Sequence, residues 1–156
     1  MQPRKPRRLS DFNYNSVGMY FVTVCSHQRE CSLGRIHNGK FYPSPLGLLT
    51  EKYWLEIPQH NPGVALYDYV VMPNHFHGLI LIGEAYTGRG LSRLVGGFKS
   101  AVSREYHRQS TSSAPVWQTS FHDHVVRNEA DLARIREYVA NNRLKWELDC
   151  YHASPD

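Results

Sequence analysis

Runs of β-branched and aromatic residues, separated by polar and turn-forming residues, predict three strands in this chain. The runs cover 19–25, 64–72 and 76–82. A shorter alternating stretch over 32–42 surrounds Asn38-Gly39, a dipeptide typical of two-residue hairpin turns. The chain is therefore expected to form a sheet of long strands and one small hairpin.

Apolar residues spaced three and four apart predict the helices. Ser44-Pro45 supplies an N-cap and a first-turn proline for the first helix, and Asn128 with Asp131 opens the last one. The predicted helices cover 45–57, 91–109 and 129–147. The order strand, helix, strand, strand, helix, helix predicts an α+β fold, a ferredoxin-like antiparallel sheet with the helices packed on one face.

The composition fits one domain. The chain has 156 residues, of which 41% are hydrophobic. We expect a flexible basic arm at 1–15, the domain at 16–148 and a short tail at 149–156. Because the sequence shows neither a long apolar run nor a signal-peptide pattern, we expect a cytoplasmic protein with no membrane partner. The three cysteines lack CxxC spacing, which argues against a cysteine zinc site or a disulfide framework.

The formal net charge of +4 comes from the N-terminal arm. Arg4, Lys5, Arg7 and Arg8 precede Ser10, and the other 14 basic residues equal the 14 acidic residues in number. Such a proline-flanked basic segment indicates either an arm that binds phosphates or a solubilising tail. Charge alone leaves both interpretations open.

The stretch "VVMPNHFHGLILI" places two histidines in a predicted buried strand. Because successive strand side chains point to opposite faces, His75 and His77 share a face and Phe76 points to the other. The pair can present two nitrogens to one divalent ion. Alternatively, both rings simply form hydrogen bonds on a solvated sheet face. A second pair, His122 and His124, lies in a polar stretch after Trp117 and on no convincing buried strand.

A metal held by two histidines needs a further protein ligand, and the final helix offers one. Tyr138 and Asn142 are four residues apart, so they lie on one face of that helix. The amide oxygen of Asn142 could complete a metal site, with the Tyr138 phenol beside it as a nucleophile. The competing interpretation makes Tyr138 a packing residue and Asn142 an ordinary helix-end residue.

Three blocks, "YVVMPNHFHGLILI", "VWQTSFHDHVVRNEADL" and "IREYVANNRLKW", together resemble the REP-associated tyrosine transposases. These are relatives of single-domain insertion-sequence transposases in the HUH nuclease superfamily. The resemblance runs from about residue 20 to residue 146, with Arg143 where the family usually has proline. It implies the HUH nuclease fold, His75, His77 and Asn142 as metal ligands, and Tyr138 as the catalytic nucleophile.

The resemblance also implies the cofactor, the substrate and the reaction. The ion would be Mg²⁺ or Mn²⁺, and the substrate single-stranded DNA beside a hairpin, a REP-like palindrome. Tyr138 would form a 5′-phosphotyrosine and release a 3′-hydroxyl, making the protein a transposase and single-stranded DNA endonuclease associated with the nucleoid. Two alternatives stay open: a non-catalytic hairpin-binding regulator derived from such an enzyme, and a small metallohydrolase in which Tyr138 is only structural.

Further residues are weaker candidates for DNA contact. The basic ones are Arg4, Lys5, Arg7, Arg8, Arg89, Arg93, Lys99 and Arg104, and the aromatic ones are Trp117, His122 and His124. Trp117 is equally suited to capping the core. The adjacent glycines Gly96 and Gly97 weaken their helix, which fits either close approach of another backbone or a kink. The short tail and the resemblance favour a monomer, although a dimer is possible.

Overall fold

The computed structural model describes residues 17–153, apart from the side chains of residues 147 and 149–153. The basic arm and its four cationic residues therefore lie outside the described residues. The elements in order are β1 (Gly18–Cys25), a 3₁₀ turn (His27–Arg29), β2 (Gly34–His37), β3 (Lys40–Pro43), α1 (Pro45–Leu55), α2 (Ile57–His60), β4 (Val64–Met72), β5 (His75–Ile82), α3 (Leu91–Gln109), β6 (His122–Val125) and α4 (Glu129–Ala153).

Four strands form one antiparallel sheet in the order β4-β5-β1-β6, and β2 pairs with β3 in a separate hairpin. The alternation strand, helix, strand, strand, helix, strand with this strand order is the ferredoxin-like arrangement. The hairpin turns at Asn38 and Gly39, both with positive φ, as a type I′ turn requires. The predicted α+β class and antiparallel sheet are confirmed.

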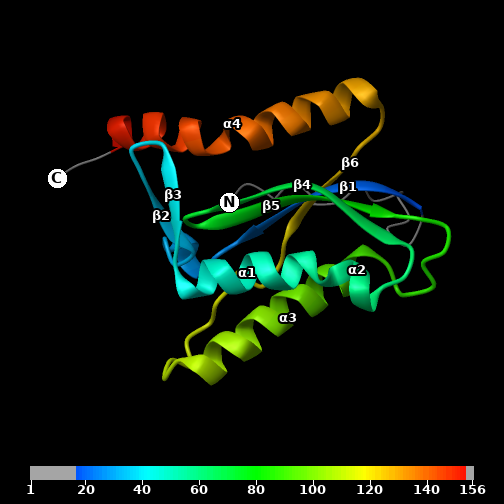
Figure 1. Ribbon diagram of the computed structural model, residues 1–156, viewed down its shortest axis with the longest axis horizontal. Helices are drawn as coiled ribbons and strands as arrows, with labels where there is room; N and C mark the ends of the chain where they lie inside the picture. The colour runs from blue at the N-terminus through cyan, green and yellow to red at the C-terminus, as the bar shows by residue number, and fades with distance from the viewer. Residues whose placement is uncertain (1–16, 154–156) are drawn as a thin grey trace, which may run out of the picture.

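One face of the sheet carries the larger core. Tyr20, Val22 and Val24 of β1 alternate onto this face and are fully buried. They pack with Trp54 of α1 and Phe98 of α3 in one apolar cluster. In Figure 1 helices α1, α2 and α3 lie below the sheet accordingly. This face contributes packing and fixes the strands that carry the histidines.

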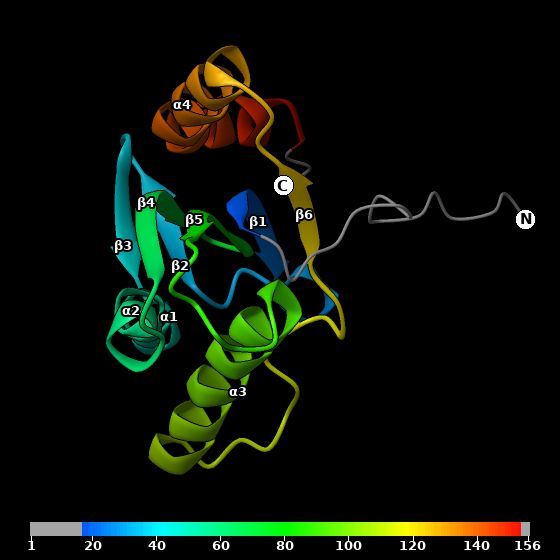
Figure 2. The ribbon, with the colours of Figure 1, turned by 90° about the vertical axis from the view of Figure 1, so that its right-hand side faces the viewer.

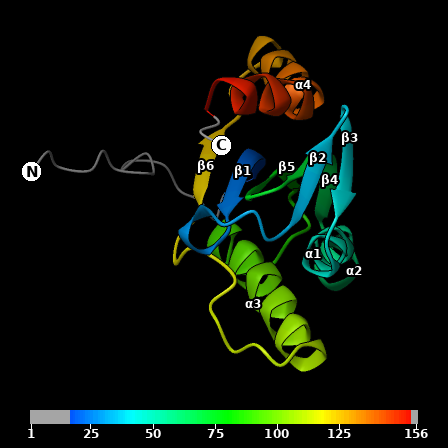
Figure 3. The same cartoon turned by 90° about the vertical axis from the view of Figure 1, so that its left-hand side faces the viewer.

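Helix α4 covers the opposite face, so the prediction that all helices pack on one face is wrong. Figures 2 and 3 show α4 above the sheet and α1, α2 and α3 beneath it. Ile135 and Val139 of α4 pack in a smaller cluster on Val70, Met72 and Leu79. The face of β1, β4 and β5 that points away from the larger core also bears apolar residues, so a helix must pack on it to bury them.

The predicted element boundaries hold with three exceptions. The helix expected over 45–57 divides into α1 and α2 at Glu56, and β6 forms in the polar stretch after Trp117, where no strand was predicted. Helix α4 continues to Ala153, so the predicted domain boundary at 148 falls within a helix. Arg143 allows this continuation, because a proline there would remove a helical hydrogen bond. Within residues 17–153, no helix combines the length and apolar character needed to span a membrane.

Candidate active site

The His75 and His77 side chains lie on the sheet face that α4 covers. In the β1–β5 ladder, His75 is opposite Cys25 and His77 is opposite Thr23. The two imidazole rings meet with their centroids 4.6 Å apart at 73°. His77 is 5% exposed, and its ring stacks on Phe21 at 5.0 Å. The strand thus holds both rings at one point beneath α4.

Neighbouring polar groups orient both histidines through Nδ1. His75 Nδ1 donates to Asn74 Oδ1 at 2.7 Å, since a carboxamide oxygen only accepts. His77 Nδ1 lies 2.8 Å from Thr23 Oγ1. With Nδ1 engaged in both rings, Nε2 is the nitrogen that could bind a metal, the arrangement that outer hydrogen bonds impose on metal-binding histidines.

Both histidines are neutral at physiological pH. The pKa of His77 is lowered to about 3, mainly by burial and also by the charge of a protonated His75. The pKa of His75 is lowered to about 4, because burial and the nearby Arg29 charge together outweigh the opposite effect of polar contact with the Asn142 side chain. Protons therefore do not compete with a metal for these nitrogens at pH 7.

Helix α4 brings Tyr138 and Asn142 to the same place. The Tyr138 ring lies 5.4 Å from the His77 ring and 6.2 Å from the Phe21 ring, measured between centroids. Tyr138 is 43% exposed, whereas Asn142 is only 4% exposed. Asn142 Oδ1 is buried and accepts no hydrogen bond of good length and angle from a described residue, although the Asn142 side chain lies close enough to the His75 ring to raise its pKa. One helical face thus offers an accessible phenol and an unused oxygen acceptor next to two imidazoles.

The unused Asn142 oxygen is the observation that fits a metal. A buried acceptor without a partner is costly unless something else binds it. Among the side chains that the structure describes, no group of three or more from His, Cys, Asp or Glu could hold an ion. A carboxamide oxygen beside two imidazole nitrogens supplies instead a neutral nitrogen and oxygen set, which leaves positions open for water or substrate.

A family model described as "Transposase IS200 like" matches residues 50–142, which is more than half of the chain and includes all four of these residues. The chain belongs to the IS200-like transposase family. This transposase is also 33% identical over 165 residues to an uncharacterized protein of Haemophilus influenzae Rd, across 94% of this chain and 91% of that protein.

Two solved structures share the fold of this transposase. A REP-associated tyrosine transposase bound to a REP hairpin matches with a TM-score of 0.65 and 18% identity, covering 88% of this chain and 74% of that one. A candidate transposase from Deinococcus radiodurans R1 matches with a TM-score of 0.53 and 18% identity, covering 86% of this chain and 97% of that one. The insertion-sequence transposase family expected from the sequence is confirmed, and the chain shares the fold of a REP-associated tyrosine transposase.

The basic residues predicted along the third helix lie away from this site. Arg93 and Arg104 are exposed on α3, which lies on the opposite side of the sheet from α4 (Figure 2), and the exposed Arg89 belongs to the loop before α3. Lys99 is partly buried, and its ammonium group donates to the Gln118 carbonyl at 2.7 Å. Burial lowers the Lys99 pKa. The α3 arginines thus lie on a surface separate from the candidate site, and Lys99 is held in the fold by its hydrogen bond to Gln118.

The aromatic residues predicted to contact DNA also differ in exposure, because Trp117 is buried and the two histidines are not. Trp117 is 7% exposed in the larger core, and its indole N–H donates to the Lys99 carbonyl. It therefore has no free face for a base, and it caps the core. His122 is exposed on β6, whereas His124 binds Asp131 at the start of α4.

The sequence reasoning missed Phe21 and Thr23, which contact His77 from the neighbouring strand. Both alternate with the buried positions of β1, so they face away from the larger core. Only the register with β5 reveals that they lie beside the histidines. It also missed Lys145, whose ammonium group lies 5.9 Å from the centre of the Tyr138 ring.

Proposed function

We propose that this transposase cleaves and rejoins single-stranded DNA beside a hairpin, through a covalent 5′-phosphotyrosine on Tyr138 and with Mg²⁺ or Mn²⁺ as cofactor. One observation carries the proposal. The partnerless, buried Asn142 oxygen and the exposed Tyr138 phenol lie on one face of α4, against two neutral histidines. The metal-ligand and nucleophile roles that the sequence predicts thus fall on four residues that the fold brings together.

The protein's part in metal binding is to supply three neutral ligand atoms. His75 Nε2, His77 Nε2 and Asn142 Oδ1 would hold the ion, with Asn74 and Thr23 fixing the imidazoles from behind. A bound divalent ion supplies a Lewis acid that withdraws charge from the scissile phosphate. Because the ligand set is neutral, it leaves the positive charge of the ion available to the phosphate.

Tyr138 performs the covalent step. Its Oη attacks the phosphorus, forming a bond to the 5′-phosphate, and the bond between phosphorus and the 3′-oxygen breaks. That oxygen takes up a proton and leaves as a 3′-hydroxyl. The phenol proton passes to solvent water, which reaches Tyr138 because 43% of the residue is exposed. Reversing the step with another 3′-hydroxyl joins the strands without an external energy source.

The hairpin substrate is proposed from the family and from charge. The REP-associated tyrosine transposase that shares this fold is bound to a REP hairpin. In this chain, Arg89, Arg93 and Arg104 are exposed and make no ion pair with a described residue. They are suited to phosphate contact, together with the N-terminal cations Arg4, Lys5, Arg7 and Arg8. A REP-like palindrome in single-stranded form is thus the proposed partner.

Denaturing gels of the protein incubated with labelled hairpin oligonucleotides test the proposal. With Mn²⁺ or Mg²⁺, wild type should form a protein–DNA adduct that EDTA abolishes. The Tyr138→Phe variant should bind the hairpin but form no adduct, whereas Tyr106→Phe, which changes a tyrosine packed on the larger core, should retain it. Hairpin binding without an adduct would instead support the regulatory alternative. A free 5′-phosphate product without an adduct would support a metallohydrolase.

A further inference from the structure

Helix α4 buries a narrow stripe of side chains against the sheet. Among its described side chains, four are buried: Asp131, Ile135, Val139 and Asn142. Their spacing of four, four and three residues makes one narrow stripe along the helix. Only two of the four are apolar; Leu132 and Trp146 add partly buried contacts to the same cluster, whereas Leu144 and Leu148 are exposed at 60% and 58%. Because apolar contact is non-directional, these side chains hold α4 on the sheet without fixing its rotation or its axial position.

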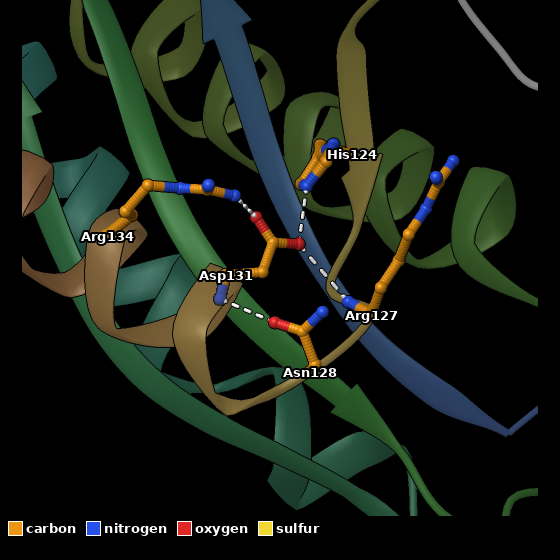
Figure 4. A network of polar contacts seen from close by, with 5 residues as sticks. All are labelled: His124, Arg127, Asn128, Asp131 and Arg134. Atoms are coloured by element: carbon orange, nitrogen blue, oxygen red, sulfur yellow. Dashed lines mark hydrogen bonds and ion pairs between the residues drawn. The ribbon is translucent and has the colours of Figure 1, made fainter.

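Asp131 ties the first turn of α4 to the sheet. Its Oδ2 accepts from His124 Nε2 at 2.8 Å and from the Arg127 backbone N–H at 3.2 Å (Figure 4). Its Oδ1 accepts from Arg134 at 2.6 Å, and its own N–H donates to Asn128 Oδ1 at 2.8 Å. The carboxylate is 5% exposed, and the bonds from His124 and Arg134 hold its pKa at about 2. The Asp131 carboxylate is thus ionised, and both of its oxygens accept hydrogen bonds.

The contact between Asp131 and His124 is connected through Phe21 to His77 and Tyr138. His124 on β6 is opposite Phe21 in the β1–β6 ladder. Phe21 in turn contacts the rings of both His77 and Tyr138. A shift of α4 against β6 would therefore change the contact between Tyr138 and the strand that carries His77.

Arg143 makes a second tie on the other side of Tyr138. One guanidinium nitrogen donates to the Val71 carbonyl at 3.2 Å, and the guanidinium carbon lies 4.3 Å from the centre of the Phe41 ring. Val71 lies between the two β4 residues that pair with the histidines, since Val70 is opposite His77 and Met72 is opposite His75. Arg143 thus connects α4 to the strand that neighbours the metal-ligand pair.

We propose that Asp131 and Arg143 are positioning residues that fix α4 at two points, so that Tyr138 and Asn142 meet His75 and His77. This inference rests on the proposed function of that site. Asp131 precedes Tyr138 by about 10 Å along the helix axis and Arg143 follows it by about 7 Å, at about 1.5 Å per residue. Directional bonds on both sides of a residue determine its rotation and its height over the sheet.

The same helix offers matched controls. Glu129 is an exposed acid in the first turn of α4, so Glu129→Gln removes a comparable helix-end charge without touching β6. Arg136 pairs with Asp68 at 3.1 Å, but its side chain is 57% exposed, and exposed ion pairs contribute little. Arg136→Gln therefore removes an α4 arginine that the proposal does not need.

Proton NMR of the metal-free protein tests the positioning without relying on activity. In wild type, nuclear Overhauser contacts should connect the Tyr138 ring with the His77 and Phe21 rings. Asp131→Asn and Arg143→Lys should each reduce those contacts at least twofold, while the contact between Phe21 and His77, which does not involve α4, stays constant as an internal reference. His124→Gln breaks the first tie from the sheet side, so it tests Asp131 even where Asp131→Asn disturbs the helix start.

Kinetics supply the second measurement. At saturating hairpin oligonucleotide, the rate constant for adduct formation should fall at least tenfold in Asp131→Asn and Arg143→Lys, with hairpin affinity within twofold of wild type. Glu129→Gln and Arg136→Gln should match wild type in both respects. Unchanged Tyr138 contacts in the three tie variants would overturn the inference. If wild type forms no adduct at all, the proposed function fails, and the NMR contacts still decide the positioning.

Discussion

The rings of His77 and Tyr138 lie 5.4 Å apart, although His77 belongs to strand β5 and Tyr138 to helix α4. A neutral, buried imidazole and an exposed phenol are thereby held side by side. Asn142, one turn further along α4, adds a buried oxygen without a partner among the described residues. The arrangement is poor for stability and well suited to binding a cation beside a nucleophile.

Asn142→Leu should separate stability from metal binding. Leucine has a similar size and removes the buried acceptor that lacks a partner. In EDTA we expect the free energy of unfolding to rise by up to about 1 kcal/mol, because an unsatisfied buried group costs about 1–3 kcal/mol. Mn²⁺ should raise the melting temperature of wild type but not of this variant. Urea unfolding and thermal scans measure both effects.

The exposed neighbour provides the control for this prediction. Asn141→Leu should leave the Mn²⁺ effect intact, since that side chain lies at the surface beside Tyr138. A loss of more than about 1 kcal/mol in Asn142→Leu without metal would mean that the Asn142 oxygen is already satisfied in the folded protein.

Acid should destabilise the metal-free protein through His75 and His77. Their folded pKa values of about 4 and about 3 lie below the ordinary 6.5. The unfolded chain therefore binds protons first, so the free energy of unfolding falls as pH drops from 6.5 toward 4. Each histidine contributes up to about 1.4 kcal/mol per pH unit. The effect of Asp131 lies lower, because its pKa falls from 3.8 to about 2.

Urea unfolding in EDTA at a series of pH values measures this slope. The double variant His75→Gln/His77→Gln should have a clearly shallower dependence between pH 6.5 and 4 than wild type. His122→Gln, which changes an exposed histidine on β6, should keep the wild-type slope. Equal slopes in wild type and the double variant would show that these two rings titrate normally.

The sequence predicted most elements because each carries its own local signal. The alternation in β1, the turn at Asn38-Gly39 and the caps at Ser44 and Asn128 depend only on neighbouring residues. Strand β6 was missed because it has four residues, His122–Val125, and an edge position that requires little apolar character. The side of the sheet that α4 covers depends on the path of the chain after β6, which has no local signal.

Two glycines with opposite surroundings test the fold that supports the site. A Cβ on Gly78 would overlap the buried Trp54 ring behind the histidine strand, whereas a Cβ on Gly97 meets nothing within 4 Å. Gly78→Ala should therefore destabilise by about 1–3 kcal/mol through overpacking. Gly97→Ala should stabilise by up to about 1 kcal/mol, because alanine is the better helix former. Chemical denaturation gives both values, and equal signs would contradict the packing described around β5.

The candidate site could be predicted as two pairs, but not as a whole. Strand and helix periodicity placed His75 with His77 and Tyr138 with Asn142, since each pair is local. The meeting of the two pairs depends on α4 crossing β5, and on the register that places Thr23 opposite His77. Those are long-range relationships. Trp117 and Lys99 were named as DNA contacts because a sequence does not show that both are tied to the core.

The exposed arginines of α3 should contribute to DNA binding through phosphates alone. Arg93→Gln and Arg104→Gln should each weaken hairpin binding and reduce the slope of log affinity against log salt by about 0.7, as expected for one single-strand phosphate contact. Arg108 is also on α3 but is bound by Glu105, so Arg108→Gln is the control with little change. Fluorescence anisotropy over a salt series measures the slopes, and wild-type slopes in both variants would remove α3 from the DNA-binding surface.

Peptide mapping of the covalent adduct tests the central claim most directly. After incubation with hairpin oligonucleotide and Mn²⁺, the protein is digested with nuclease and trypsin, and the modified peptide is sequenced by mass spectrometry. A 5′-linked nucleotide on Tyr138, within tryptic peptide 137–143, is the predicted result. A nucleotide on Tyr106 or any other residue would contradict the assignment of Tyr138 as the nucleophile.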